Sequence, residues 1–304
     1  MQVRILGSAA GGGFPQWNCA CANCDAVRAG KFPGKARLQT QLAISSGGND
    51  WFLLGASPDL RTQIESCPDL LPRGSRRSPV SGVVLASADL DHVLGLLLLR
   101  ELHPFQVWAA SSTVEILRGQ NSMFGMLNRV ENQVRWNVIR DGQNFQPESA
   151  SSRTSGITVT AIALSSRGPA YAATGTSSAE AVLGLVVQSP EGQKLGFFPQ
   201  LPQLTPQLRE LFATLDCLLL DGTFWSDDEL VRVQGSGQRA REMGHVPVGG
   251  NEGTLAQLAG LTVPRKMYIH INNTNPMLNE AGLEYRQVRD AGWELAEDGC
   301  QFNL

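Results

Sequence analysis

Three cysteines near the amino terminus are spaced as metal ligands. Cys19, Cys21 and Cys24 place three thiolates within six residues, and structural zinc is normally held by four ligands in a tetrahedron. The fourth ligand would come from elsewhere in the chain as a histidine, an aspartate or an asparagine, because no other cysteine lies in a paired motif. A free thiol cluster or a redox pair is the alternative, while a four-sulfur iron cluster lacks its fourth spaced cysteine. A site filled by protein ligands would serve structure rather than catalysis.

A second group of metal-ligand residues follows the apolar run at 82–85. Asp89, Asp91 and His92 occur in the sequence Ser87-Ala88-Asp89-Leu90-Asp91-His92. Carboxylates directly after a buried strand are unfavourable unless they are paired, hydrated or bound to a cation. As an alternative, Asp91 would cap the helix that follows. A cap needs only one carboxylate, whereas two carboxylates and a histidine occur together here.

Two more polar residues end apolar runs, and a histidine lies between them in the sequence. Asp221 follows the run at 217–220, and His270 follows the run at 267–269. The intervening histidine is His245. A lone histidine after a strand is more often a hydrogen-bonded core residue than a ligand. Repeated polar groups at strand ends, however, predict an active site at the edge of a sheet.

The remaining cysteines and the fourth histidine have simpler explanations. Cys67, Cys217 and Cys300 are scattered, which in a reducing compartment is typical of small buried apolar residues. His103 ends a predicted helix, where we expect a solvent-facing side chain with a favourable contact to the helix dipole.

Short strands are the main elements that would carry these residues. Eleven runs have the composition of strands, and Gly47-Gly48-Asn49-Asp50 between the second and third predicts a hairpin turn. The runs are 3–6, 41–45, 51–54, 82–85, 106–109, 133–138, 157–163, 182–187, 194–198, 217–220 and 266–271.

Helical patterns are fewer and are interspersed among the strands. The first is opened by Ser57-Pro58-Asp59, a capping residue before proline, and segments 143–146 and 172–178 are expected to be surface loops. The pattern favours a sheet-on-sheet sandwich with helices outside and the site at the strand ends. The predicted helices are 59–66, 91–102, 112–119, 206–214, 253–261 and 280–291.

Composition and charge exclude several classes of function. The 304 residues are 42% hydrophobic, which is enough for a sizeable core. The net charge of −3 does not indicate the basic surface that binds nucleic acid. The longest apolar run, 93–99, is far shorter than the roughly 20 residues that span a membrane, and no export signal is visible. We therefore expect a cytoplasmic protein with one domain over residues 1–304 and no membrane or nucleic-acid partner. The sequence does not indicate the oligomeric state.

Several longer motifs resemble one family over nearly the whole chain. They are LGSAAGGGFPQWNC at 6–19, SPD at 57–59, LDGTFW at 220–225, GHVPVGG at 244–250 and HINNTNP at 270–276. In this order they resemble the pyrroloquinoline quinone (PQQ) biosynthesis protein B (PqqB) family of the metallo-β-lactamase superfamily. The resemblance implies an α/β fold, the four-layer αββα sandwich.

The resemblance also exposes a departure from the superfamily's metal motif. That motif reads His-x-His-x-Asp-His and binds two metals in hydrolytic members, and the corresponding residues here are Ser87, Asp89, Asp91 and His92. Both histidines of the first metal are therefore replaced. The aspartate that usually bridges the metals aligns with Gln200.

The ligands of the second metal survive. Asp91, His92 and His270 would form this site, and Asp89 would complete it or bond a bound water. One carboxylate and two imidazoles with open positions suit non-haem Fe(II) and oxygen activation. A two-metal hydroxide for hydrolysis needs ligands that the sequence has lost.

The family resemblance implies a hydroxylase in PQQ synthesis, acting on the tyrosine ring of a Glu–Tyr-derived precursor. The predicted catalytic residues are the proposed iron ligands together with Asp221 and His245. By similarity to other superfamily members, His245 would face the metal opposite Asp221, and this pair would move protons from a phenol. A buried hydrogen-bonded pair without that role is the alternative.

The fourth zinc ligand is also suggested by resemblance. A phosphodiesterase branch of the superfamily shares the cysteine motif and closes its zinc site three residues after the final ligand histidine, which here is Asn273. Asn275 or a water remains an alternative. Two other functions compete with the hydroxylase: a metal-dependent hydrolase, the usual activity of the fold, and a non-enzymatic carrier that transports PQQ or its precursor.

Overall fold

The chain forms two compact units, each built from segments that are discontinuous in sequence. The computed structural model describes residues 1–149, 152–173 and 178–304. Unit 1 comprises Met1–Gly7, Gln41–Lys194 and Gly299–Leu304, and unit 2 comprises Ser8–Thr40 and Leu195–Asp298. The expectation of a single domain over residues 1–304 stays a prediction.

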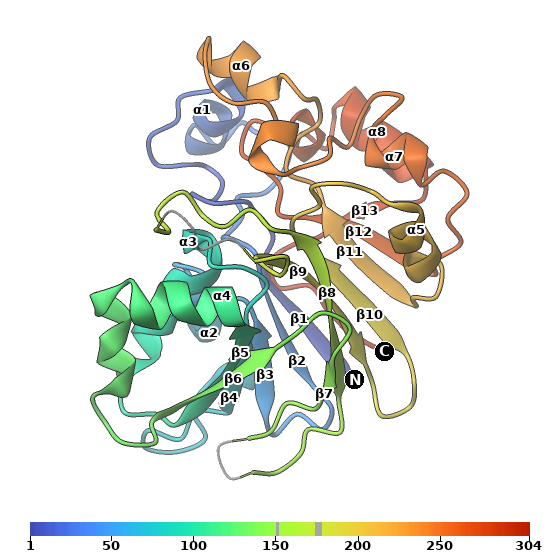
Figure 1. Ribbon diagram of the computed structural model, residues 1–304. Helices are drawn as coiled ribbons and strands as arrows, with labels where there is room; N and C mark the ends of the chain where they lie inside the picture. Colours follow the sequence, from blue (N-terminus) through green and yellow to red (C-terminus); the bar gives the residue numbers. More distant parts are fainter. Residues whose placement is uncertain (150–151, 174–177) are drawn as a thin grey trace. The chain divides into compact units, whose positions relative to one another are not determined.

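Unit 1 contains a mixed seven-stranded sheet in the order β14-β1-β2-β3-β4-β5-β6 (Figure 1). The pairs from β14 to β3 are antiparallel, and the pairs from β3 to β6 are parallel. Strands β2 to β5 are buried along their whole length, which explains their apolar composition. The strands are β1 (Gln2–Gly7), β2 (Gln41–Ser45), β3 (Trp51–Leu54), β4 (Val80–Val84), β5 (Phe105–Ala110), β6 (Val134–Ile139) and β14 (Gln301–Asn303).

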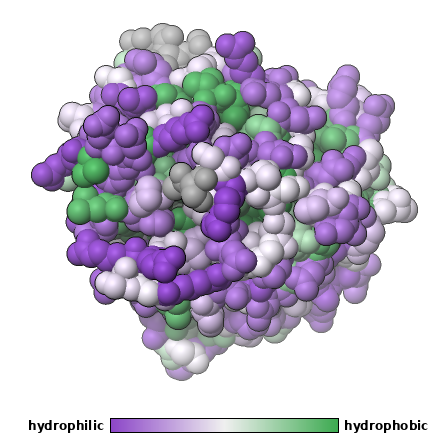
Figure 2. Space-filling view, turned by 90° about the horizontal axis from the view of Figure 1, so that it is seen from below, coloured by the Kyte–Doolittle hydropathy of each residue, from purple (hydrophilic) through white to green (hydrophobic). Residues whose placement is uncertain are grey.

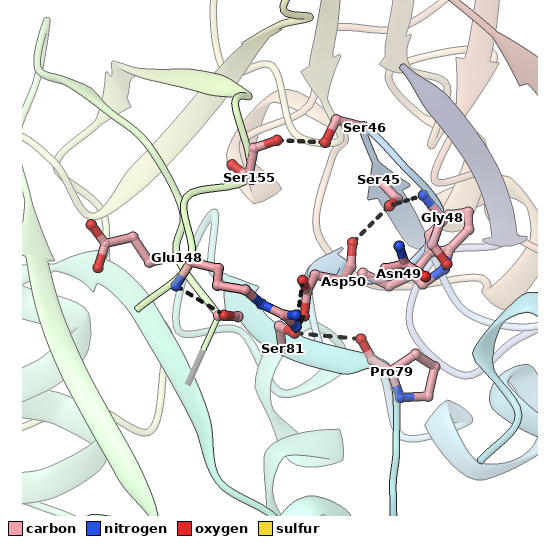
Figure 3. Close-up of polar contacts among 12 residues, drawn as sticks. Ser45, Ser46, Gly48, Asn49, Asp50, Pro79, Ser81, Glu148 and Ser155 are labelled. Atoms are coloured by element: carbon pink, nitrogen blue, oxygen red, sulfur yellow. Dashed lines mark hydrogen bonds and ion pairs between the residues drawn. The ribbon is translucent and has the colours of Figure 1, made fainter. Parts of the chain in front are cut away.

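The turn between β2 and β3 confirms the predicted hairpin. Gly48 has a left-handed backbone with a φ of 73°, and its N–H donates to the Ser45 hydroxyl at 2.8 Å. The same hydroxyl donates to the Asp50 carbonyl at 2.7 Å, and the Ser81 hydroxyl donates to the Asp50 carboxylate at 2.8 Å (Figure 3). These polar contacts join the hairpin to the start of β4.

Unit 1 also contains an antiparallel ladder and several short helices. The ladder is formed by β7 (Asn144–Phe145), β8 (Thr158–Ser165) and β9 (Val182–Gln188). The α-helices are α2 (Leu60–Glu65), α3 (Leu90–Val93) and α4 (Ser111–Val114). The other turns are 3-10 helices at Pro68–Leu70, Leu94–Arg100 and Ser122–Asn128, and a π-helical turn at Glu115–Gly119.

Unit 2 contains four parallel strands and five α-helices among its described residues. The strands are β10 (Lys194–Phe198), β11 (Cys217–Asp221), β12 (Arg265–Ile269) and β13 (Glu294–Leu295), paired in this order. The α-helices are α1 (Ala22–Arg28), α5 (Pro206–Phe212), α6 (Glu229–Gln234), α7 (Thr254–Gln257) and α8 (Leu283–Asp290). Two 3-10 turns lie at Arg241–Met243 and Pro276–Leu278.

The eleven predicted strands are confirmed, with differences at their ends, and the helices are confirmed less completely. The prediction of a continuous helix over 91–102 is wrong, because α3 ends at Val93 and a 3-10 helix continues the chain. The segment 143–146, predicted as a loop, contains β7, which pairs with β8. Of the second predicted loop, 172–178, residues 174–177 lie outside the described residues.

Because the apolar side chains of the strands are buried, few hydrophobic side chains are expected on the surface. The face drawn in Figure 2 is mainly hydrophilic, and hydrophobic side chains are confined to small separate areas. None of the helices in the described part of the chain has the length and apolar character needed to cross a membrane.

Candidate metal centre

The cysteine cluster lies within unit 2 around the start of α1. Cys19 and Cys21 precede the helix, and Cys24 lies in its first turn. The three sulfurs lie within 4.8 Å of one another. Arg28 at the end of the helix donates to the Cys19 carbonyl at 2.5 Å. The predicted grouping of these thiols is therefore present in the structure.

The side chain of Asn273 lies against all three sulfurs. Its Nδ2 is 3.2, 3.6 and 3.3 Å from the Sγ atoms of Cys19, Cys21 and Cys24. Asn23, in the first turn of α1, donates from Nδ2 to the Asn273 carbonyl at 3.1 Å. The two ends of an amide are assigned from hydrogen bonding, and its oxygen is the end that ligates a cation. The residue proposed as the fourth zinc ligand therefore lies beside the three sulfurs, and its role as a ligand stays a prediction.

The electrostatics of the cluster favour a bound cation. Burial works to raise the pKa of Cys19, but hydrogen bonds from Cys21, Cys24 and Asn273 lower it below its ordinary value. Burial raises the pKa of Cys21 to about 11, and the neighbouring thiols add to this effect. One thiolate is thus stabilised while a second is opposed, because Cys21 is partly buried and lies beside the other thiols. A divalent cation removes that opposition, so three sulfurs and an amide oxygen fit zinc.

In unit 1, the polar residues after β4 form a short hydrogen-bonded chain. The Ser87 hydroxyl donates to Asp89 Oδ2 at 2.8 Å and lies 2.9 Å from His92 Nδ1. His92 is buried, and its Nε2 lies 3.9 Å from Asp91 Oδ2. The backbone of His92 is also fixed, since its carbonyl accepts from Ala56 N–H at 2.7 Å. Ser87, which replaces a ligand histidine of the superfamily motif, thus contacts the surviving histidine.

The alternative role of Asp91 as a helix cap is wrong. Helix α3 begins at Leu90, so Asp91 lies inside the helix and Asp89 occupies the capping position. The Asp89 side chain makes no capping hydrogen bond and accepts from Ser87 instead. Both carboxylates therefore need an explanation other than capping.

In unit 2, β11 and β12 end at the same edge and place the other predicted residues together. Asp221 is the last residue of β11, its register partner in β12 is Ile269, and His270 follows directly. Asp221 is fully buried, and each of its oxygens accepts two hydrogen bonds. Oδ1 accepts from the Thr223 N–H at 3.0 Å and hydroxyl at 2.6 Å, and Oδ2 contacts Leu201 N–H and His245 Nδ1, both at 2.8 Å.

These hydrogen bonds define the role of Asp221. Complete burial alone would raise its pKa, but His245, His270 and Thr223 hold the pKa below its ordinary value. The carboxylate is therefore ionised and is saturated by donors from the protein. Although Asp221, His245 and His270 lie close enough to hold a metal, we assign Asp221 to orienting the imidazoles.

The two imidazoles of unit 2 are stacked. The ring centroids of His245 and His270 lie 5.5 Å apart at an interplanar angle of 19°. The Thr223 hydroxyl lies 2.8 Å from His270 Nδ1. The backbone of His270 has a φ of 60°, a left-handed conformation that costs a non-glycine residue about 1–3 kcal/mol and often occurs at functional sites.

A cavity within unit 2 brings the cysteine loop and these histidines together. Its volume is about 760 Å³, and Cys19, Cys21, Asn273, His245 and His270 all line it. The apolar part of the lining includes Phe224, Leu230, Val233 and Met243. The cavity therefore combines imidazoles with a wall suited to an organic ring.

The predicted residues are thus placed in three groups. One comprises the cysteines with Asn273, one comprises Asp89, Asp91 and His92 in unit 1, and one comprises Asp221, His245 and His270 in unit 2. The combination of Asp91 and His92 with His270 as one ligand set stays a prediction, since these residues belong to different units.

Sequence reasoning missed a buried carboxyl group in unit 2. Glu229, the first residue of α6, accepts from Trp225 N–H at 2.6 Å and from the Thr274 hydroxyl at 2.5 Å. Asn272 Nδ2 donates to the same hydroxyl at 2.6 Å. Burial raises the pKa of Glu229 to about 7. No sequence signal indicated this role, because no helix is predicted at this position and a glutamate is usually exposed.

Ser87 and Thr223 were also missed as functional residues, although both lie in the quoted motifs. Hydroxyl residues are common in strand-end loops, so their identity alone indicates no role. The expectation for His103 is wrong. It lies three residues after the 3-10 helix at Leu94–Arg100, it is half-buried, and its Nε2 is hydrogen-bonded to the Val80 carbonyl at 2.6 Å. Cys67 and Cys217 are buried as expected, whereas Cys300 is half-exposed.

Comparison with known proteins agrees with this arrangement. Residues 50–271 match the model of the beta-lactamase superfamily domain. The structure of Zn²⁺-bound PqqB from Methylobacterium extorquens superposes with a TM-score of 0.92 and 35% identity over the whole of both chains. A diphosphatase of the PhnP family, at 17% identity and a TM-score of 0.68, shares the fold. The matched domain and the superposition define a metallo-β-lactamase superfamily protein, which confirms the predicted fold class.

Relatives within this superfamily are closer in sequence. Coenzyme PQQ synthesis protein B of Nitrosococcus oceani is 41% identical, and that of a Methylobacterium strain is 38% identical, each over the full length of both chains. The chain belongs to the coenzyme PQQ synthesis protein B (PqqB) family. This confirms the family resemblance of its motifs.

Proposed function

We propose that this chain is an Fe(II)- and oxygen-dependent hydroxylase of PQQ synthesis, acting on the tyrosine ring of a Glu–Tyr-derived precursor. Family membership supports the pathway, since the relatives are named for coenzyme PQQ synthesis. The observation that carries the chemistry is the donor set: the two motif histidines that hold the first metal of a two-metal hydrolase are replaced by Ser87 and Asp89. The Ser87 hydroxyl is engaged by Asp89 and His92, so it does not substitute for a lost ligand.

Asp91, His92 and His270 are the proposed iron ligands, an assignment that rests on the sequence motif. Two imidazoles and one carboxylate form the donor set of non-haem Fe(II) oxygenases, and Fe(II) bound there supplies the activation of dioxygen. Asp89 supports this site through Ser87. The cluster of Cys19, Cys21, Cys24 and Asn273 holds zinc and stabilises the loop that forms one wall of the cavity.

Unit 2 supplies the groups that bind and deprotonate a phenolic ring. The ring packs on the apolar wall formed by Phe224, Leu230 and Met243, and the cavity volume of about 760 Å³ is of the size that binds small organic ligands. His245 accepts the phenolic proton at Nε2, because Nδ1 is held by Asp221 at 2.8 Å. The buried carboxylate then stabilises the imidazolium.

Reconstitution tests the proposal. Protein loaded anaerobically with Fe(II) is mixed with oxygen, ascorbate and a Glu–Tyr dipeptide, and the products are analysed by mass spectrometry. One oxygen atom is expected in the ring, and the other leaves as water with two electrons from ascorbate. His92→Ala and His270→Ala should lose this product, while His103→Gln is the matched control, because His103 bonds to a backbone carbonyl.

The competing functions give different results in the same experiment. A carrier would bind the dipeptide or PQQ, would form no hydroxylated product even as the Fe(II)-loaded wild type, and would bind with unchanged affinity in the His92→Ala variant. A hydrolase would cleave the peptide bond without oxygen. Either result refutes the hydroxylase.

A further inference from the structure

A hydroxyl group links a histidine to a carboxylate in unit 1. Ser87 Oγ contacts His92 Nδ1 at 2.9 Å and Asp89 Oδ2 at 2.8 Å, and it also accepts from the Asp89 N–H at 3.2 Å. A hydroxyl has one proton and two lone pairs. An ionised carboxylate only accepts, so the Ser87 proton points to Asp89 and both lone pairs accept. His92 Nδ1 must therefore carry a proton.

The same arrangement occurs independently in unit 2. Thr223 Oγ1 contacts His270 Nδ1 at 2.8 Å and Asp221 Oδ1 at 2.6 Å. The His270 carbonyl, at 2.9 Å, is a second acceptor for the hydroxyl proton. The carboxylate is closer and charged, so it binds that proton more strongly. His270 Nδ1 must then donate to Thr223.

We propose that Ser87 and Thr223 are positioning residues, each of which fixes its histidine as the Nδ1–H tautomer. This tautomer makes Nε2 the basic nitrogen of both imidazoles and restricts the rotation of both rings. Groups that orient a ligand histidine in this way typically change metal affinity by about 10–100-fold when they are removed. The consequence for metal binding rests on the proposed function, whereas the tautomer itself does not.

The proposal explains why a serine occupies the first position of the altered metal motif. In the superfamily motif this position carries a ligand histidine, and here the shorter side chain bonds to the remaining histidine five residues later. The position that holds a ligand of the first metal in the superfamily motif would thus, in this chain, hold Ser87, which orients His92, a ligand of the second metal. Thr223 performs the same task from the loop after β11.

Nitrogen NMR tests the tautomers directly, because the chain has only four histidines. Long-range ¹H–¹⁵N correlation spectra are recorded on zinc-containing protein with labelled imidazoles at about pH 8, above the ordinary imidazole pKa. The expected wild-type spectrum shows His92 and His270 protonated at Nδ1. An Nε2–H form of either histidine in the wild type overturns the assignment for that histidine.

Paired variants then separate the hydroxyl from side-chain bulk. Ser87→Ala and Thr223→Val should each move the neighbouring histidine towards the Nε2–H form. Ser87→Thr and Thr223→Ser retain a hydroxyl and should retain Nδ1–H. Unchanged tautomers in the Ala and Val variants overturn the proposal.

Anaerobic Fe(II) titration of the same proteins tests the consequence for binding. Affinity should fall about 10–100-fold in Ser87→Ala and Thr223→Val and recover in the hydroxyl-retaining variants. If the tautomers change and Fe(II) affinity does not, the role in metal binding is refuted. If the wild type binds no Fe(II), the proposed function fails, while the spectra still decide the tautomer.

Discussion

Glu229 provides a quantitative test of the buried network in unit 2. It is 5% exposed, and its oxygens accept from the backbone of Trp225 and the hydroxyl of Thr274. Burial disfavours the charged form and raises the pKa of Glu229 from 4.5 to about 7. The substitution Glu229→Gln preserves the size of the side chain and removes its titration.

The sign and size of the effect follow from proton linkage. Below pH 4.5 both the folded and unfolded states hold the proton. As the pH rises from 4.5 to about 7, the unfolded state releases the proton first, so the stability of the wild type falls. A difference of about 2.5 pKa units corresponds to about 3 kcal/mol in the free energy of unfolding. The glutamine variant lacks this contribution.

Urea denaturation from about pH 4 to 8 measures the effect in both proteins. The wild type should lose about 3 kcal/mol relative to Glu229→Gln over this range, with most of the loss between pH 4.5 and 7. Titration of the cysteines and histidines is common to both proteins and cancels in the difference. Glu191→Gln, which removes an exposed carboxylate, is the control and should parallel the wild type. A difference that stays constant with pH, or that grows in favour of the wild type, refutes the reasoning.

Three further predictions concern the zinc cluster and the packing of unit 2. Asn273→Ala should weaken zinc binding at the cysteines by at least about tenfold in a chelator competition. Asn18→Ala, which changes the residue next to Cys19, is the control and should leave zinc binding unchanged. Removing the metal with a chelator should lower the Tm, since zinc at 100 times its Kd contributes about 2.7 kcal/mol; an unchanged Tm by calorimetry counts against a structural role. Gly253→Ala should cost about 1–3 kcal/mol in urea denaturation, because its Cβ would lie 2.2 Å from the Gly249 carbonyl oxygen. Gly125→Ala, with nothing within 4 Å, should change stability by less than about 0.5 kcal/mol.

The strands were the most predictable part of the fold. Buried parallel strands such as β11 are continuous apolar runs, and this pattern is visible without any structural information. The missed strands β7, β13 and β14 have only two or three residues, too few to establish an alternation. The missed helices α1 and α6 have seven and six residues, fewer than two turns of apolar periodicity.

The candidate site was predictable where residue type and spacing carry information. Thiols at 19, 21 and 24 and acidic residues at a strand end are rare combinations, so they indicated ligands from the sequence alone. Ser87, Thr223 and Glu229 acquire their roles from neighbours that are distant in sequence, such as Thr274 for Glu229. The sequence around each of these residues does not predict contacts with residues so distant in the chain. Asn273 was found only through family resemblance, because an asparagine among several others is not distinctive.

The pairing of the cysteine loop with Asn273 has a consequence for newly made chains. Asn273 lies 254 residues after Cys19, and at about 5–20 residues per second the ribosome needs roughly 13–50 s to reach it. During that interval the thiols of a nascent chain lack their amide partner and are open to oxidants or to stray metal ions. Zinc supply during translation would then decide how many chains mature. Thiol labelling of ribosome-stalled chains that end before and after residue 273 would reveal the moment of closure.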